Sequence, residues 1–234
     1  MNTTGELPIK LVVATQLSQE RFFAESLTAV SMRANLHASP VELRLYSDNS
    51  MGLSEVYNDA IEASIEEDAI LVFAHDDVLI SDYFWAERVR AGLEDFELLG
   101  VVGNTRRSPK QAGWIMLDTL GTLDEFEHLS GAIGQGSSFP PEKLDHFGTP
   151  GLECKLLDGV FLAISTATLR TSKLRFDPQF RFHFYDLDLC RSAEILNIKM
   201  GTMPLSLVHK SWGNLDQEWL SAYQNYLHKW GEAQ

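Results

Sequence analysis

The sequence of 234 residues predicts an α/β fold, a single domain in which helices flank a mostly parallel central sheet. Short, nearly continuous apolar runs rich in β-branched residues, such as Ile9–Ala14, alternate with segments whose apolar residues recur at helical spacing. Such alternation is typical of parallel strands joined by crossover helices. The chain has no internal repeat, low-complexity tract or clear linker, so we expect residues 1–234 to form one domain.

The first hundred residues show the alternation most clearly. Their apolar runs are short enough for buried strands, and polar caps precede the longer amphipathic segments. Either Ser81 or Asp82 can cap the third helix. The expected strands are Ile9–Ala14, Glu42–Tyr46, Ala69–Ala74 and Leu98–Gly103, and the expected helices are Ser18–Met32, Leu53–Ser64 and Asp82–Leu93.

The second half begins with a stretch of different composition. Residues 131–151 hold five of the 16 glycines and three of the eight prolines, without periodicity. This predicts a long loop, either a lid over a bound ligand or a tolerated insertion. The expected strands beyond it are Leu156–Ile164, Phe180–Phe184 and Leu205–Val208, and the expected helices are Leu187–Leu196, ending over residues 197–201, and Gln217–Trp230.

Composition excludes several classes of protein. A net charge of −14 argues against a general nucleic-acid binder, because no basic stripe is available to neutralise phosphates. Cys154 and Cys190 form neither a metal motif nor a disulfide framework. The N-terminus resembles neither a signal peptide nor a membrane span, so we expect a cytoplasmic protein. Arg106, Arg107 and Lys110 either steer phosphates or an acidic acceptor, or belong to a solvated loop.

Polar residues follow three of the predicted strands. Thr15 follows the first, Asp48 and Asn49 follow the second, and His75-Asp76-Asp77 follows the third. Ligands of open α/β sheets bind outside the carboxyl ends of the strands, so these side chains should converge. Adjacent carboxylates suit a hard divalent cation, although a solvated turn is the alternative. His75 can order this turn by hydrogen bonding.

Three further residues are candidates. Asp186 and Asp188 precede or begin a predicted helix, and either can simply cap it. Alternatively, one of them is a general base, which the helix N-terminus would keep ionised at neutral pH. His209 ends a short apolar strand, and it becomes a candidate metal ligand only if the acidic turn already holds a cation.

Five short segments, taken together in their order along the chain, resemble the family 2 glycosyltransferases, and most closely their small StrF-like branch. The resemblance extends from Ile9 to Trp230 and implies a GT-A fold that binds a nucleoside-diphosphate sugar through a divalent cation, Mn²⁺ or Mg²⁺. The segments are "YSDNSMGLSEVYNDAI", "ILVFAHDDV", "LLDGVFLAI", "FDPQFRFHFYDLDLCRSA" and "LVHKSWG".

The resemblance also implies roles for individual residues. Asp186 matches the catalytic base, while Asp77 and His209 match metal ligands. His75 and Tyr185 stand where this family usually has acids, in its DxD and ED motifs. The residues expected to bind the nucleotide sugar are Thr15, Asp48, Asn49, His75 and Asp76, and those expected near the acceptor are Asp158, Gly159 and Tyr185.

The expected function is therefore a metal-dependent, inverting transfer of a sugar to an acceptor hydroxyl. Residues 1–105 would form the donor-binding half and residues 106–234 the acceptor and catalytic half. The acceptor would be a glycan, a lipid-linked molecule or a small molecule. One alternative is a non-catalytic module that binds a nucleotide sugar or glycan. Another, which the acidic clusters alone would permit, is a metal-dependent phosphoester hydrolase.

Overall fold

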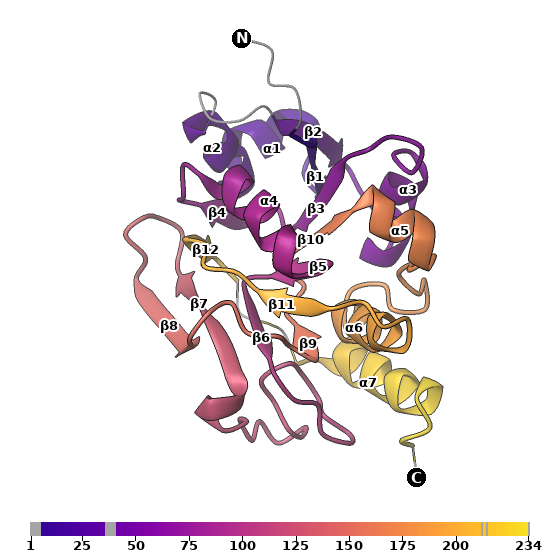
Figure 1. The fold of residues 1–234 in the computed structure, drawn as a ribbon. Helices are drawn as coiled ribbons and strands as arrows, with labels where there is room; N and C mark the ends of the chain where they lie inside the picture. The colour runs from indigo at the N-terminus through magenta and orange to yellow at the C-terminus, as the bar shows by residue number, and fades with distance from the viewer. Residues whose placement is uncertain (1–5, 36–40, 212, 214, 234) are drawn as a thin grey trace.

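Two six-stranded sheets organise the chain in the computed structural model (Figure 1). The structure describes residues 6–35, 41–211, 213 and 215–233. Trp212, in the last motif segment, lies outside these ranges. The first sheet has the strand order β11 (Met200–Thr202), β5 (Leu98–Gly100), β10 (Phe161–Ser165), β3 (Ile70–Ala74), β1 (Ile9–Ala14) and β2 (Val41–Tyr46).

This first sheet is the predicted mostly parallel one. β1 pairs in parallel with both β2 and β3, and β11 pairs in parallel with β5. Only β10 runs antiparallel to its two neighbours. The predicted fold class, α/β with helices flanking this sheet, is confirmed.

Side chains of the sheet alternate between two hydrophobic cores. On β3, Leu71 and Phe73 enter one core, while Ile70, Val72 and Ala74 enter the other. The first core receives α3 (Leu53–Glu62), α5 (Thr166–Ser172), α6 (Tyr185–Ile195) and α7 (Gln217–Lys229), and the second receives α1 (Gln19–Glu25), α2 (Leu27–Ala34) and α4 (Trp85–Asp95).

The second sheet is mostly antiparallel. Within it, only β12 and β7 pair in parallel. Figure 1 shows it beside the lower end of the first sheet, with β7 and β8 at its outer side. Its strands are β4 (Val78–Ile80), β12 (Leu207–His209), β7 (Leu129–Gln135), β6 (Val102–Asn104) and β9 (Leu156–Leu157), with β8 (Lys143–Gly148) paired to β7.

Two predicted strands are each divided between the sheets. The apolar run 98–103 becomes β5 and β6, because the chain leaves the first sheet at Val101. The run 156–164 becomes β9 and β10, because Asp158–Val160 carries the chain across. Each run was predicted as one strand because it is apolar throughout. In the structure both pieces of each run are buried, so the apolar pattern carries no sign of the division.

The predicted loop 131–151 is wrong, since most of this segment forms the β7–β8 hairpin. A Cβ at Gly131 would overlap the Val101 carbonyl, and one at Gly134 would lie 2.8 Å from Pro141. These two glycines therefore allow close packing within the second sheet, and they do not mark an irregular loop.

Other predicted boundaries also change. Residues 180–184 form no strand, and Phe180 and Phe184 instead pack on Tyr226 of α7. The helix predicted over 18–32 is two helices, because Ser26 is extended and its side chain caps α2. The short strands β4 and β11 were not predicted.

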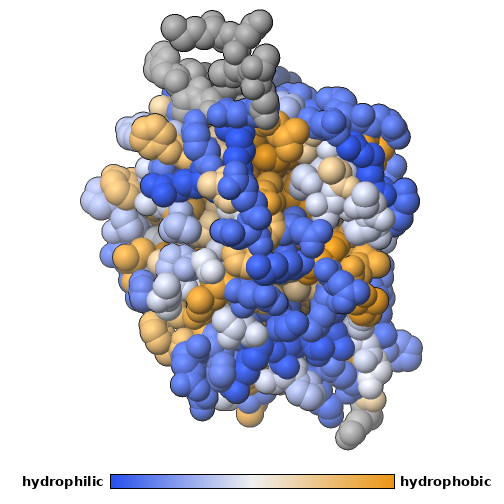
Figure 2. Space-filling view, viewed as in Figure 1, coloured by the Kyte–Doolittle hydropathy of each residue, from blue (hydrophilic) through white to orange (hydrophobic). Residues whose placement is uncertain are grey.

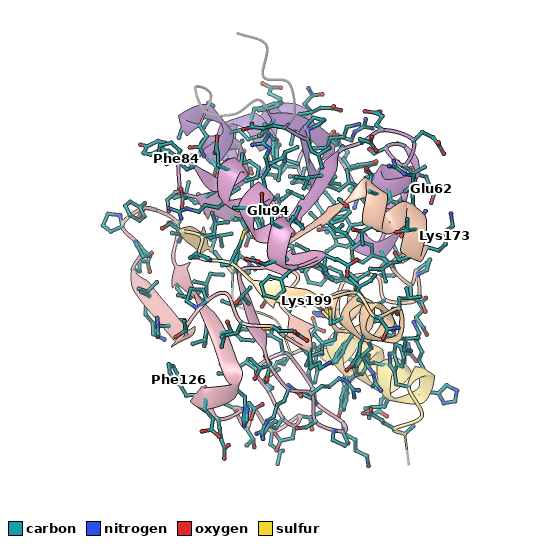
Figure 3. The ribbon with its side chains drawn as sticks, viewed as in Figure 1. Glu62, Phe84, Glu94, Phe126, Lys173 and Lys199 are labelled. Carbon is teal, nitrogen blue, oxygen red and sulfur yellow. The ribbon has the colours of Figure 1, made fainter. Side chains whose placement is uncertain are left out.

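The surface is mostly hydrophilic on the face shown in Figure 2, in keeping with the net charge of −14. Phe84 and Phe126 are exceptions, with 66% and 59% of their surface exposed, and both project outward in Figure 3. Among the helices of the described residues, none is both long enough and apolar enough to span a membrane.

Candidate active site

The turn His75-Asp76-Asp77 joins the two sheets, because β3 belongs to the first and β4 to the second. The N-terminus of α2 holds it in place. The Ser26 hydroxyl donates to the Asp76 carbonyl at 2.5 Å, and the Thr28 hydroxyl donates to the His75 carbonyl at 2.7 Å. These bonds fix the backbone that presents three polar side chains.

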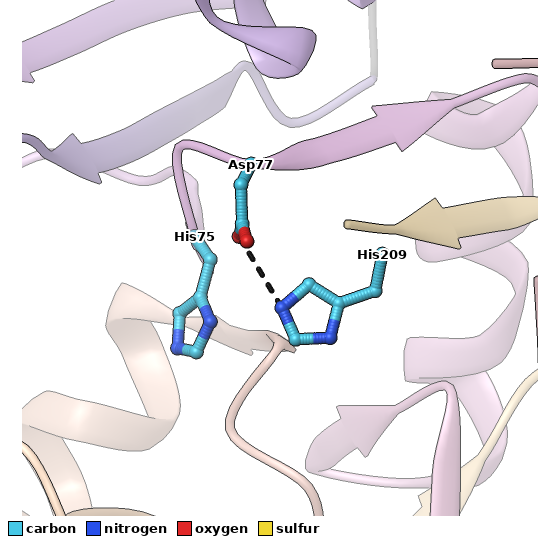
Figure 4. A group of neighbouring side chains, drawn as sticks. All are labelled: His75, Asp77 and His209. Atoms are coloured by element: carbon cyan, nitrogen blue, oxygen red, sulfur yellow. Dashed lines mark ion pairs between the residues drawn. The ribbon is translucent and has the colours of Figure 1, made fainter. Parts of the chain in front are cut away.

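His75 and Asp77 meet His209, which lies at the end of β12 (Figure 4). Potential ligand atoms of the three side chains lie within 4.8 Å of one another. The closest contact joins His209 Nε2 to Asp77 Oδ1 at 3.2 Å, and the Ser211 N–H donates to the same carboxylate at 3.1 Å. The structure therefore brings together two imidazoles and one carboxylate from distant parts of the chain.

Asp77, His209 and His75 shift one another's pKa values. Burial opposes ionisation of Asp77, but its hydrogen bond and ion pair with His209 hold its pKa well below the usual range. Burial likewise opposes charging of His209, yet Asp77 raises the pKa of that imidazole. Burial and the neighbouring His209 lower the pKa of His75, which favours its neutral form.

Asp186 lies in the first turn of α6 and faces the crossing between β9 and β10. Its Oδ2 accepts from the Gly159 N–H at 2.9 Å. Burial, and then the charge of Asp158, raise the pKa of Asp186 to about 7. The expectation that the helix N-terminus keeps this acid fully ionised at neutral pH is therefore wrong, because these two effects outweigh its backbone hydrogen bonds.

Position 159 has no room for a side chain, so it requires glycine. A Cβ at this position would overlap the Tyr185 hydroxyl and approach Cβ of Asp186 to 3.0 Å. The absent side chain thus lets α6 bring Asp186 against the crossing strand.

Tyr185 connects Asp186 and Gly159 to the histidine cluster. Its hydroxyl donates to the Gly159 carbonyl at 2.9 Å and also lies 2.9 Å from His75 Nε2. Tyr185 is 3% exposed, so these are internal hydrogen bonds. The base predicted at Asp186 and the predicted metal ligands thus belong to one connected group.

A cleft of about 1040 Å³ meets this group at Asp77, while His75, Tyr185, Asp186 and His209 are not among the residues that line it. Thr15, Asn49, Asp76 and Asp77 line it, in agreement with convergence at the carboxyl ends of β1, β2 and β3. The Thr15 hydroxyl donates to Asp76 at 2.5 Å, and the Asn49 N–H donates to the Thr15 carbonyl at 2.9 Å.

Three further candidate acids, Asp48, Asp158 and Asp188, are not among the residues that line this cleft. Asp48 is exposed, has a left-handed φ of 49°, and is not among the residues that line the cleft. Asp158, partly buried, accepts from the Val160 N–H at 2.8 Å within the crossing. Asp188 is fully buried and accepts from Lys229 and from the indole of Trp230, so its role is structural.

Several residues that line the cleft were not predicted. Arg181, Phe182 and His183 come from the segment predicted as a strand, and Lys210 follows His209. The Phe182 ring stacks with His75 at a centroid distance of 6.3 Å. A possible signal was the polar and aromatic alternation of "FRFHF", which is as compatible with an exposed loop as with a strand.

Both arginines of the basic segment Arg106, Arg107 and Lys110 have acidic partners. Arg106 pairs with the carboxylate of Asp124, and Arg107 lies 3.5 Å from Glu194 and 3.6 Å from Glu232. These contacts favour a structural role over phosphate steering.

Comparison with known proteins adds information on the fold alone. No family model matches the chain. No curated protein matches it either. Among solved structures, A197 from STIV has a TM-score of 0.50 at 11% identity, over 89% of this chain and 87% of that one. Residues 1–349 of S. aureus TarS, a glycosyltransferase, give a TM-score of 0.49 at 12% identity, over 94% of this chain and 64% of that one. At these identities neither likeness carries an activity over to this chain.

Proposed function

We propose that the protein transfers a sugar from a nucleoside-diphosphate sugar to an acceptor hydroxyl, with a divalent cation and with inversion at the anomeric carbon. The main support for this proposal is that Asp77 belongs to two features of the site. It lines the large cleft and also belongs to the cluster of His75, Asp77 and His209. A cation held there would lie at the wall of the cleft, where a bound diphosphate would need it.

The donor set suits a divalent cation. Asp77 offers a carboxylate oxygen and His209 an imidazole nitrogen, 3.2 Å apart, which is about the spacing of neighbouring ligands of one ion. When bound, the cation would neutralise the negative charge that develops on the leaving diphosphate.

The cleft offers groups for the rest of the donor. Thr15, Asn49 and Asp76 supply hydroxyl, amide and carboxylate groups at the ends of β1, β2 and β3, suited to a base and a ribose. Arg181 and Lys210 add positive charge to the same cleft, but five acidic residues also line it, so binding of a diphosphate there would depend on the cation. Asp48 is exposed and precedes Asn49, which lines the cleft.

Asp186 would act as the general base. In the proposed step, the acceptor oxygen forms a bond to the anomeric carbon as the bond from that carbon to the diphosphate oxygen breaks. The acceptor proton moves to the Asp186 carboxylate, and the nucleoside diphosphate leaves. A single displacement of this kind inverts the configuration. Asp158, Gly159 and Tyr185 surround Asp186. Asp158 is partly exposed and would contact the acceptor, whereas Gly159 and Tyr185 are buried and would not.

The decisive experiment separates donor binding from turnover. We expect calorimetry with UDP, GDP and dTDP to detect binding of at least one nucleotide that requires Mn²⁺. Asp77→Ala should lose this binding, because it removes the carboxylate shared by the cleft and the cation cluster. Asp186→Asn should retain binding and lose turnover of the matching nucleotide sugar, by about 10²- to 10⁴-fold for a lost general base.

Other outcomes would identify other functions. Slow hydrolysis of the donor without acceptor is expected of a transferase, whereas a non-catalytic binding module would bind the donor and leave it intact. Phosphate release without sugar transfer would indicate a phosphoester hydrolase. Absence of cation-dependent nucleotide binding would overturn the proposal.

A further inference from the structure

We propose that His75 is a third ligand of the cation site, through Nδ1, and that Tyr185 is the positioning residue that fixes this nitrogen as the donor. The site would then hold a borderline transition-metal ion such as Co²⁺ or Zn²⁺ more tightly than Mg²⁺. This inference rests on the cation of the proposed function, but it needs neither a nucleotide nor a sugar. It differs from the sequence prediction, which placed His75 with the nucleotide sugar.

Hydrogen-bond accounting determines the tautomer of His75. The Tyr185 hydroxyl carries one proton, and the Gly159 carbonyl, 2.9 Å away, can only accept. If the phenolic proton went to His75, the contact with the Gly159 carbonyl would lack a proton, so both contacts are hydrogen bonds only when this proton goes to Gly159. His75 Nε2, also 2.9 Å from this hydroxyl, must donate its own proton to the phenolic oxygen. A neutral His75 in this tautomer has its free lone pair on Nδ1.

The orientation of the ring agrees with this assignment. In Figure 4, one nitrogen of His75 faces His209 and Asp77, while the other points away from both. Since Nε2 is committed to Tyr185, the nitrogen that faces the cluster is Nδ1. The rings of His75 and His209 lie 5.6 Å apart between centroids, and candidate ligand atoms of all three residues lie within 4.8 Å. Small side-chain rotations would bring them to the maximum ligand separation of about 4.2 Å that bonds of about 2.1 Å allow.

Tyr185 resembles the outer partners found at many metal sites, which fix the tautomer and orientation of a ligating imidazole. Its own position is determined by burial at 3% exposure and by the absence of a side chain at Gly159. This gives a physical role to both departures from the family pattern. His75 would replace an acidic residue as a ligand, and Tyr185, in place of another acid, would orient it.

The chemistry of the three donors determines the preferred ion. Two imidazoles and one carboxylate favour first-row transition metals, whereas Mg²⁺ prefers sites made of oxygen ligands. Affinity within the series should rise from Mn²⁺ to Co²⁺, following the general order for nitrogen and oxygen donors. A site made of Asp76 and Asp77 oxygens alone would show no such preference over Mg²⁺.

The test measures metal binding alone, by calorimetry of the chelator-treated protein with Co²⁺, Mn²⁺ and Mg²⁺ and without nucleotide. We expect one ion per chain and an affinity order of Co²⁺ over Mn²⁺ over Mg²⁺. Tyr185→Phe should weaken Co²⁺ binding by about 10- to 100-fold, as loss of an outer hydrogen-bond partner typically does. His75→Ala should weaken it at least as much and alter the visible spectrum of bound Co²⁺. Circular dichroism would verify that both variants fold.

Two controls make the result specific. His128→Ala removes a histidine from the other group of potential ligands among the described residues, Glu125, Glu127 and His128, and should leave Co²⁺ binding unchanged. In a His75→Ala background, Tyr185→Phe should have no further effect on residual Co²⁺ affinity, because Tyr185 acts through His75. A merely structural role of Tyr185 would persist in that background.

The inference is overturned if His75→Ala binds Co²⁺ as wild type does, or if Mg²⁺ binds as tightly as Co²⁺. Such a result would leave the proposed function intact if Asp77 still governed nucleotide binding. Conversely, the predicted metal selectivity without any nucleotide binding would overturn the proposed function and support this inference.

Discussion

Asp186 and Asp188 stand two positions apart on α6, yet they face different partners. A separation of two residues is about 200° around a helix, so their side chains point to nearly opposite sides. Asp186 accepts from Gly159 at the crossing between the sheets, while Asp188 accepts from Lys229 and Trp230 next to α7. The sequence left open whether either acid caps the helix. The N-cap is Phe184, in a left-handed conformation with φ of 62°.

The raised pKa of Asp186 predicts a pH dependence. A base must be ionised, so kcat/KM should rise as the pH increases through about 7, the pKa to which burial and Asp158 raise this carboxyl. Asp158→Asn should move the rising limb to lower pH, because it removes the negative charge that opposes ionisation of Asp186. Initial rates between pH 5.5 and 9 would test this. An unmoved limb in Asp158→Asn would contradict the assignment of Asp186 as base.

At the scale of elements, the candidate site is formed where the chain passes between the two sheets. The β3–β4 turn contributes His75, Asp76 and Asp77, and the β9–β10 crossing contributes Asp158 and Gly159. Strand ends at such crossings leave the regular ladder, so their polar groups are free to face a ligand. This explains why the site residues fall within or beside runs that read as apolar strands.

The contact between α6 and α7 predicts a difference between two acids that share one lysine. Asp188→Ala should lower the free energy of unfolding by about 2–4 kcal/mol, because its buried carboxylate accepts from Lys229 at 2.8 Å and from the Trp230 indole at 2.9 Å. Asp177→Ala is the matched control. It removes a more exposed partner of Lys229, 2.7 Å away, and should cost less than about 1 kcal/mol.

Urea unfolding of both variants, followed by circular dichroism, would measure this difference. Equal losses of stability in Asp188→Ala and Asp177→Ala would contradict this prediction. They would show that burial of the Asp188 carboxylate does not increase its contribution to the free energy of unfolding.

At the scale of the whole molecule, the two halves of the chain are interleaved. β10 and β11, from residues beyond 105, lie within the first sheet, and β4 and β6, from residues before 105, lie within the second. The predicted division into a donor-binding half, 1–105, and an acceptor half, 106–234, therefore remains a prediction about roles. Neither half contains a complete sheet of its own.

This interleaving predicts cooperative unfolding. Scanning calorimetry of the whole chain should show one transition, with a calorimetric enthalpy close to the van 't Hoff enthalpy, because neither sheet can form without strands from both halves. A fragment of residues 1–105 should lack a cooperative transition, since β3 and β5 would lose β10 between them. Two resolved transitions in the whole chain would instead indicate two independent folding units.

Elements whose signal is local could be predicted from the sequence alone. Apolar runs such as Ile9–Ala14 and the helical spacing of Gln217–Lys229 depend on neighbours in the chain, and both elements were predicted nearly to their ends. The convergence of Thr15, Asn49 and Asp76 was also predictable, because parallel strands end at one edge.

The assignment of each strand to its sheet, and the contacts among the site residues, depend on the packing of the whole chain. Both pieces of each divided run are apolar and buried, so the run cannot reveal that the chain changes sheets at Val101 or at Asp158–Val160. The contact of His75 with Tyr185 joins residues 110 positions apart, and the pKa of Asp186 depends on burial and on Asp158. Such long-range contacts arise from packing of the whole chain, for which no local pattern provides a signal.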